Sequence, residues 1–390
     1  MARSAADFRC DICVVGGGPA GAVAAHVLAG AGARVALIVR DRRNAALAVG
    51  ETVPAETQPI LKRLGLDCLS PDLHVPSAGT MARWGSDTIH FREAILSPYG
   101  CGWHLDRHLF ERQLRAAAVK NGAALLENCA RIVTKATPKG WKFRIESADR
   151  QLDVTSSYLF DGTGRAARLA IAAGARRQVH DKLIAIWSVV EALNGRHDPD
   201  QRIYLETAPD GWLYSAQIPN RRRVIAYFTD GDLVDLSRTR SAAAFEKYIA
   251  NSFQLSSVTD GLHYRVVTGP FRVNAASTRL AQAYGGRWIA AGDAAQSFDP
   301  LSSQGILSAI VGGNNAAAAL IAAHSSDSSA LEKLQADLDA RYAEYLAERQ
   351  VHYRAEQRWK QRLFWQRRHD NLPTEPQASL AGLLASASPL

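Results

Sequence analysis

Apolar and polar positions near the start of the chain follow the pattern of a strand, a turn, a helix and a second strand. Residues 11–15 form a short apolar, β-branched run, which is typical of a buried parallel strand. A glycine-rich turn follows, after which residues 19–28 predict a small-residue helix and residues 33–39 a second buried strand. The pattern indicates a βαβ unit of about 30 residues, the context that a dinucleotide-binding fingerprint requires.

The spacing of apolar positions changes between residue 183 and residue 278. Apolar residues there recur at every second position, and turn signals such as Pro209-Asp210-Gly211 separate the runs. We therefore expect an antiparallel sheet inserted into the first domain. The runs cover residues 184–190, 202–206, 212–218, 223–228 and 264–267.

The remaining segments return to alternating helix and strand patterns. They predict a helix over 106–121, strands over 154–160 and 288–291, an alanine-rich helix over 303–323, and a long polar helix from 329 to 368. We expect an α/β protein with three parts. These are a Rossmann-like domain of residues 1–180 and 279–325, an antiparallel-sheet substrate domain of residues 181–278, and a C-terminal helix and tail of residues 326–390.

Composition and charge exclude several classes of protein. The 390 residues are 47% hydrophobic and 22% charged, as in ordinary folded proteins. The net charge of +8 is spread along the chain without a nucleic-acid-binding motif, so we expect no nucleic-acid partner. The first residues lack the apolar core of a signal peptide, and glycines interrupt the apolar stretch 12–39. We therefore expect a cytoplasmic protein without a membrane span.

The cysteines do not predict a disulfide framework or a metal site. Their number is odd and their spacing sparse. Cys10 and Cys13 form a C-x-x-C pair at the start of the first strand, but no second pair accompanies it, so we interpret the pair as structural.

The glycine-rich turn reads Gly-Gly-Gly-Pro-Ala-Gly over residues 16–21, a complete G-x-G-x-x-G motif. In such a motif Gly16 permits the tight turn, Gly18 lets a pyrophosphate approach the backbone, and Gly21 lets helix and strand pack closely. The helix N-terminus then offers free N–H groups to the phosphates. Asp41 lies 20 residues after Gly21 and is the candidate ribose ligand, although Arg40 occupies the more usual position.

Two later motifs indicate which dinucleotide binds. Asp161-Gly162 ends an apolar strand, and Gly292-Asp293 ends another, where a carboxylate can accept hydrogen bonds from a ribityl chain. The turn at 298–306 opens a helix at Gly305 whose N-terminal amides can face a flavin ring. Gly162, Gly164 and Ala167 also fit a second fingerprint, but we interpret this match as accidental because no further βαβ unit follows.

These motifs in combination resemble the FAD-dependent aromatic hydroxylase superfamily, over residues 1–180 and 279–325. The resemblance implies an FAD-binding domain of the glutathione reductase or p-hydroxybenzoate hydroxylase type. Arg107 resembles the family arginine that opens a helix near the cofactor, and its alternative is a surface helix-cap cation. The cofactor-binding residues that the resemblance implies are Gly16, Gly18, Pro19, Ala20, Gly21, Asp41, Thr52, Arg107, Asp161, Gly162, Gly292, Asp293, Pro300, Ser303, Gly305 and Ile306.

The segment Gly50-Glu51-Thr52-Val53-Pro54 resembles a loop that flavin-dependent halogenases share with non-halogenating relatives, where it passes beside the isoalloxazine. The alternative is a helix-capping turn in which Thr52 caps a helix running through Leu61. Two departures argue against halogenation. No lysine occurs from Arg63 to Val119, and the halogenase W-x-W-x-I-P motif is replaced by a longer segment, 212–219, with Tyr214 at the second aromatic position.

Together with the Trp84-Gly85-Ser86 turn, these segments resemble the flavoprotein monooxygenases that mature tryptophylquinone enzymes. The resemblance implies that a flavin C4a-hydroperoxide hydroxylates a tryptophan of a partner polypeptide, towards cysteine tryptophylquinone. Glu51 and His104 are the catalytic candidates, each with a structural alternative, and Trp212 and Tyr214 are candidate walls of the substrate pocket. Only one convincing fingerprint exists, so we expect NADH or NADPH to donate electrons either directly or through a separate reductase.

Several alternatives stay open. The chain can instead be a small-molecule aromatic hydroxylase, a halogenase-like enzyme, a flavoenzyme like the geranylgeranyl reductases, or a non-catalytic maturation chaperone. The segment 341–368 carries eight Lys or Arg against three Glu, with interleaved aromatic residues. It fits a docking surface for an acidic protein, or a helix packed on the FAD domain. A membrane surface is less favoured.

Overall fold

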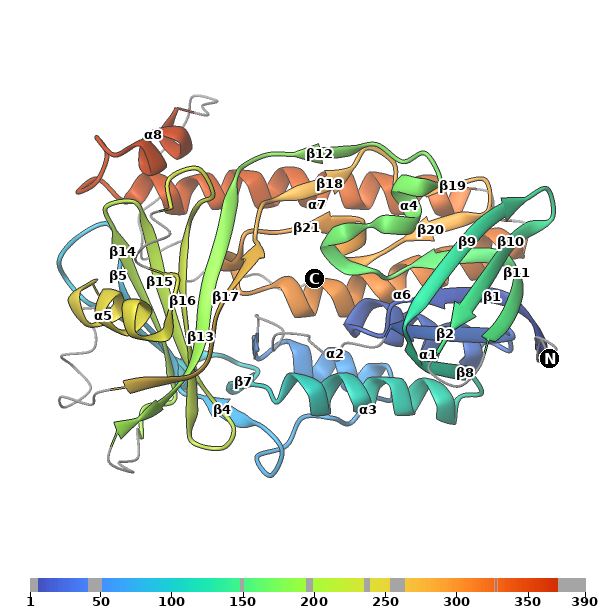
Figure 1. The fold of residues 1–390 in the computed structure, drawn as a ribbon, viewed down its shortest axis with the longest axis horizontal. Helices are drawn as coiled ribbons and strands as arrows, with labels where there is room; N and C mark the ends of the chain where they lie inside the picture. Colours follow the sequence, from blue (N-terminus) through green and yellow to red (C-terminus); the bar gives the residue numbers. More distant parts are fainter. Residues whose placement is uncertain are drawn as a thin grey trace.

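A computed structural model describes residues 6–40, 51–147, 151–193, 199–234, 239–252, 264–325, 327 and 329–370. Two large sheets stand at opposite ends of an elongated molecule, and the long helix α7 runs along both (Figure 1). The fold is α/β, as predicted from the sequence, with a helical C-terminal part.

The first sheet has a parallel centre, in the order β20-β11-β1-β2-β8. Two antiparallel strands, β10 and β9, extend from β11, and β19 closes the other edge. The sequence pattern did not predict β8, β9 or β10. The strands are β1 (Ala6–Val15), β2 (Val35–Arg40), β8 (Ala124–Cys129), β9 (Arg131–Thr137), β10 (Gly140–Glu146), β11 (Gln151–Asp161), β19 (Tyr284–Gly285) and β20 (Trp288–Ala290).

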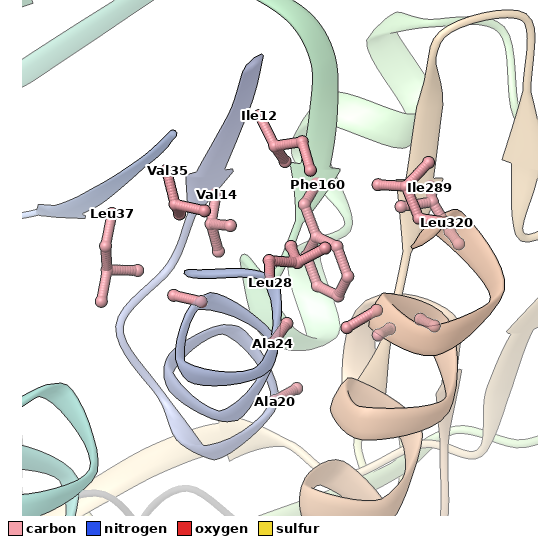
Figure 2. Packing of buried hydrophobic residues seen from close by; sticks show 14 of the residues in the cluster. Ile12, Val14, Ala20, Ala24, Leu28, Val35, Leu37, Phe160, Ile289 and Leu320 are labelled. Carbon is pink, nitrogen blue, oxygen red and sulfur yellow. The ribbon is translucent and has the colours of Figure 1, made fainter. Parts of the chain in front are cut away.

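Two small-residue helices, α1 and α6, pack side by side against this sheet. Figure 2 shows Val14, Val35 and Phe160 from the strands facing Ala24 and Leu28 of α1. The close approach of the helices requires glycine, because a Cβ on Gly313 of α6 would overlap the backbone carbonyl of Ala20. The helices of this part are α1 (Pro19–Gly30), α2 (Thr57–Arg63), α3 (Arg107–Lys120), α4 (Arg168–Ala172) and α6 (Gly305–His324).

By length and composition, α6 is the single helix in the described ranges that is apolar enough to cross a membrane. It packs against α1 and α7, and its residues Ala309, Ala316 and Leu320 belong to the core of the first sheet.

The second sheet has seven strands, in the order β17-β13-β16-β15-β14-β5-β6. It is mixed rather than antiparallel throughout, because β14 pairs with β5 in parallel. Strands β5 and β6 come from a segment that the sequence pattern placed in the first domain. The strands are β5 (Gly79–Arg83), β6 (His90–Glu93), β13 (Leu183–Ala192), β14 (Arg202–Ala208), β15 (Gly211–Ile218), β16 (Arg222–Asp230) and β17 (Tyr264–Asn274).

The two faces of the second sheet have different partners. One face packs on α5 (Ala242–Ser252) through Phe245 and Ile249. The other carries Trp187 and Trp212 and packs on the C-terminal helices. Two three-stranded sheets complete the fold. They comprise β3 (Thr52–Val53), β7 (Gly102–His104) and β4 (Val75–Ser77), and β12 (Arg177–Val179), β18 (Thr278–Leu280) and β21 (Gln296–Ser297).

The C-terminal segment forms two helices, α7 (Ser329–Ala355) and α8 (Leu363–His369), so the prediction of one continuous helix to residue 368 is wrong. The break begins at Glu356, whose buried carboxylate accepts hydrogen bonds from the Gly85 amide and the Thr207 hydroxyl. Most of the interleaved aromatic side chains of this segment face inward, and Trp359 is half-buried against the same cluster. Those that are buried are Tyr342, Tyr345, Tyr353, Phe364 and Trp365.

Candidate flavin site and its buried polar cluster

The glycine turn after β1 is shaped by backbone contacts that only glycine permits. Gly16 has a φ of +115°, and a Cβ there would overlap the carbonyl of Gly162. A Cβ on Gly21 would overlap the carbonyl of Gly16. These contacts hold the end of β1, the start of α1 and the end of β11 together.

Gly18 differs from those two glycines because it borders open space. Among the described residues, no heavy atom lies within 4 Å of a Cβ built on Gly18, and no side chain caps α1. The first amides of α1 are therefore available to an anion. Gly305, at the start of α6, shares both properties. Two uncapped, glycine-lined helix N-termini fit the pyrophosphate and the electron-rich flavin ring of FAD.

Pro19 and Ala20 lie in the first turn of α1, and Ile306 follows Gly305 in the first turn of α6. Pro300 begins the 3₁₀ turn η7 (Pro300–Ser302), and Ser303 ends it in a left-handed conformation with a φ of +52°. This places Ser303 directly before the N-terminus of α6.

The two strand-end aspartates have different surroundings. Asp293, in the 3₁₀ turn η6 (Gly292–Ala294), is 34% exposed and lies 3.5 Å from Nε of Arg165. It can accept hydrogen bonds from a ligand. Asp161 is fully buried, and its oxygens accept from the amides of Thr163, Leu169 and Ala170. The Asp161 carboxylate therefore organises the turn beside Gly162 instead of facing open space.

Gly292 has a φ of +58°, and a Cβ there would lie 2.6 Å from Cβ of Ala20. This contact packs η6 against the first turn of α1. The predicted ribityl carboxylate, Asp293, is thereby held next to the predicted phosphate-binding helix.

Two arginines of α3 make contacts of interest, and only one of them, Arg107, was predicted from the sequence. Arg107 opens the helix after its cap, Asp106, and its Nη2 lies 2.7 Å from Oε1 of Glu111. Arg115 was not predicted, yet its Nη1 donates to the carbonyl of Gly17 at 3.1 Å. Arg115 thus contacts the glycine turn although it lies 98 residues after Gly17 in the sequence. Asp41, the predicted ribose ligand, lies outside the described residues.

The segment that begins at Glu51 forms a strand and not a helix cap. Thr52 and Val53 make up β3, which pairs with β7, whereas α2 begins only at Thr57. Val53 packs with Ile306, so β3 lies against the first turn of α6. The alternative in which Thr52 caps a helix is wrong.

A partly buried polar cluster gathers around Thr52. Its Oγ1 lies 3.0 Å from Nδ1 of His104 and 2.7 Å from the phenolic oxygen of Tyr214. Glu51 is 3% exposed and lies beside Tyr214. Burial, reinforced by the nearby Glu51 charge, raises the pKa of the Tyr214 phenol well above its usual value. The predicted base and the predicted pocket wall are thus direct neighbours.

His104 is fully buried, and both of its ring nitrogens are engaged. Nε2 lies 2.9 Å from the carbonyl of Gln201, opposite the contact of Nδ1 with Thr52. Burial lowers the pKa of His104 to about 4. The imidazole is therefore neutral at pH 7 and holds Thr52 in place, without a nitrogen left over to exchange protons with a substrate.

Trp212 lies on the same face of β15 as Tyr214 but is packed in a closed aromatic cluster. Its ring stacks on Phe228 with centroids 4.0 Å apart, and its Nε1 donates to the Tyr353 hydroxyl at 3.0 Å. It is 0% exposed. Of the two predicted pocket residues, only Tyr214 lies next to the Glu51 cluster.

Three known proteins resemble the chain over most of its length. The putative FAD-dependent oxidoreductase LodB of Marinomonas mediterranea is 30% identical over 370 residues, which cover 92% of this chain and 96% of LodB. The myxobacterial chondrochloren halogenase CndH superposes with a TM-score of 0.81 at 20% identity, covering 93% of this chain and 86% of CndH. The peptidyl tryptophan dihydroxylase QhpG, essential for tryptophylquinone cofactor biogenesis, superposes with a TM-score of 0.71 at 21% identity, covering 92% of this chain and 78% of QhpG.

At these identities the two structures establish a shared fold, whereas LodB is a relative by sequence. A family model described as FAD binding domain matches residues 9–346, which span the glycine turn, both strand-end aspartates and most of α7. The chain therefore belongs to the FAD binding domain family, among its flavin-dependent oxidoreductases and monooxygenases.

Proposed function

We propose that this FAD-dependent monooxygenase hydroxylates a tryptophan side chain of a partner polypeptide, as a step towards a tryptophylquinone cofactor. The observation that carries the proposal is the buried Glu51 carboxyl group, which lies where β3, the N-terminus of α6 and the second sheet meet. The class of substrate follows the likeness to QhpG and the sequence motifs shared with flavoproteins that mature tryptophylquinone enzymes.

The chain's own residues would hold FAD at the two helix N-termini. The amides beside Gly18 would bind the pyrophosphate, Asp293 would accept from the ribityl hydroxyls, and the N-terminus of α6 would stabilise negative charge on the flavin ring. Reduced FAD, when bound, supplies activated dioxygen, from which one oxygen atom enters the aromatic ring. NADH or NADPH provides the two electrons, directly or through a separate reductase.

Glu51 receives the proton that the ring releases after oxygen insertion. The C–H bond at the hydroxylated carbon breaks, its electron pair restores the aromatic system, and the proton moves to a carboxylate oxygen of Glu51. Glu51 and His104 are themselves buried, so water has little access to this carboxyl group. No protein nucleophile is needed for this reaction.

Halogenation is a less favourable assignment despite the fold shared with CndH. The sequence has no lysine from Arg63 to Val119, and Tyr214 takes the second aromatic position of the W-x-W-x-I-P motif. In the structure, the Tyr214 hydroxyl joins the Glu51 cluster. These features favour a site that handles protons over one that activates halide.

The experiment is turnover of candidate partner polypeptides by the FAD-loaded protein with a reductant in air. Polypeptides encoded beside its gene are offered and then weighed by mass spectrometry. We expect a gain of one or two oxygen atoms on a tryptophan, and loss of this product with Glu51→Gln. Glu56→Gln, a change five residues along the same segment, is the matched control and should retain the product. Oxidation of a small aromatic molecule with no modified polypeptide would contradict the proposal.

A further inference from the structure

A continuous hydrogen-bond chain links the backbone of the second sheet to the Glu51 cluster. It runs from the Gln201 carbonyl through Nε2 and Nδ1 of His104 to the Thr52 hydroxyl, and from there to the Tyr214 hydroxyl. The three contacts are 2.9, 3.0 and 2.7 Å long. All are short enough for well-formed hydrogen bonds.

The chemistry of the groups fixes the direction of this chain. A carbonyl oxygen only accepts, so Nε2 of His104 carries the ring hydrogen and donates it to Gln201. The ring is neutral at pH 7, which leaves a lone pair on Nδ1 to accept the hydroxyl hydrogen of Thr52. The Thr52 oxygen is then the acceptor for the Tyr214 hydroxyl hydrogen.

Glu51 competes for that same hydrogen. Its carboxyl group lies beside the Tyr214 phenol and interacts with it electrostatically, and a phenol has only one hydrogen to donate. Burial keeps the phenol neutral, so Tyr214 donates its hydrogen to either Thr52 or Glu51 at any one time. The other titratable or charged neighbours of this cluster are His104 from β7 and Arg223 from β16.

We propose that Tyr214 is a positioning residue that turns its hydroxyl hydrogen to Glu51 when that group is ionised and to Thr52 when it is protonated. In the ionised state, the phenol stabilises the carboxylate. In the protonated state, the Glu51 O–H donates to the Tyr214 oxygen, and the Tyr214 hydrogen returns to Thr52. His104 and Gln201 hold the Thr52 oxygen ready as this second acceptor.

Only the catalytic consequence of this inference rests on the proposed function. There, Tyr214 holds Glu51 ionised before the ring proton is released, and Thr52 takes over the phenolic hydrogen afterwards. The equilibrium itself is a property of the resting protein and is measurable without a substrate.

The test is a pH titration of the resting FAD-loaded protein by infrared difference spectroscopy. The C=O stretch of a protonated carboxyl group reports on Glu51, and Glu51→Gln identifies its band. Tyr214→Phe removes the donor to the ionised Glu51. We therefore expect the midpoint of the Glu51 titration to rise by about one pH unit, which corresponds to the loss of one hydrogen bond. Thr52→Val removes the alternative acceptor, so we expect the midpoint to fall.

Two controls separate this behaviour from a general disturbance of the site. Thr52→Ser keeps the hydroxyl and should restore the original midpoint. Tyr227→Phe removes a phenol of β16 that donates to the carbonyl of Asp210, and should leave the midpoint unchanged. If Tyr214→Phe does not fold, the Thr52→Val and Thr52→Ser pair carries the test.

Shifts of opposite sign for Tyr214→Phe and Thr52→Val would support the inference, because a purely structural disturbance has no reason to produce them. An unchanged midpoint in Thr52→Val, or shifts of the same sign, would overturn it. Since no substrate is present, these results are independent of whether the partner polypeptide has been identified correctly.

Discussion

Tyr353 donates its phenolic hydrogen to Oδ2 of Asp299 at 2.8 Å, and both side chains are buried. The same hydroxyl accepts the indole hydrogen of Trp212 at 3.0 Å. Asp299 caps the turn that leads into the N-terminus of α6, and Trp212 belongs to the second sheet. A single residue of α7 therefore connects the candidate flavin turn to the candidate substrate sheet.

Replacing this tyrosine should weaken both connections. Tyr353→Phe leaves the buried Asp299 carboxylate and the Trp212 N–H each without one partner, so we expect unfolding free energy to fall by about 2–3 kcal/mol. FAD affinity should fall as well, because the turn before α6 loses an anchor. Urea denaturation and flavin fluorescence titration measure the two effects. Tyr284→Phe is the control, since the Tyr284 hydroxyl makes no hydrogen bond within the described ranges; an equal loss there would refute the explanation.

Gly16 and Gly18 should respond differently to alanine. Gly16→Ala forces a Cβ against the Gly162 carbonyl at a positive φ, so we expect a less stable fold. The Cβ added by Gly18→Ala lies in open space, so the free energy of unfolding should stay within about 0.5 kcal/mol of that of the original protein. We nevertheless expect FAD affinity to drop at least tenfold, on the order of 1.4 kcal/mol, because the methyl group occupies the approach to the helix N-terminus. Unchanged FAD affinity in Gly18→Ala would place the pyrophosphate elsewhere.

The depressed pKa of His104 predicts a loss of stability in acid. The unfolded histidine binds a proton near pH 6.5 and the folded one only near pH 4, so protons favour the unfolded chain between these values. From pH 6.5 to pH 5 this group alone should cost about 2 kcal/mol. Burial also lowers the pKa of His74 and His352, which adds to the trend. In His104→Asn the decline between these pH values should be shallower, and an identical decline would show that His104 does not contribute to it.

Glu356 should be important for the attachment of the C-terminal segment. Its carboxylate is 0% exposed and accepts from Gly85, Thr207 and Arg358. Glu356→Ala leaves the Arg358 guanidinium without its nearest carboxylate, so we expect the free energy of unfolding to fall by about 3–5 kcal/mol in urea denaturation. Glu332→Ala, at an exposed position in the first turn of α7, should change stability by less than about 0.5 kcal/mol.

Local pattern was enough to predict the α/β fold and a dinucleotide-binding turn, and the resemblance of the motifs to a known superfamily implied FAD. The βαβ unit and the glycine turn depend on residues close together in the sequence. Local pattern could not indicate that β5 and β6 belong to the second sheet, because β5 pairs with β14, more than a hundred residues further along the chain, and β6 pairs with β5. The break between α7 and α8 was missed because the partners of Glu356, Gly85 and Thr207, are also more than a hundred residues away.

The candidate site was predictable in residue type but not in the direction of its side chains. The motifs at Asp161 and Asp293 both implied a contact with the cofactor, yet only the structure shows that Asp161 turns back to backbone amides. Arg115 had no motif to reveal its contact with Gly17. Glu51 directly precedes β3 and Tyr214 lies in β15, so neither periodicity nor spacing could predict that they are neighbours.

The most direct test of the account is to follow the origin of the inserted oxygen. The FAD-loaded protein, a reductant and the candidate partner polypeptide are incubated under ¹⁸O-labelled dioxygen in unlabelled water. The account predicts a tryptophan of the polypeptide that carries the heavy isotope. Oxygen derived from water, a halogenated tryptophan, or dioxygen consumption with label only in a small molecule would contradict it.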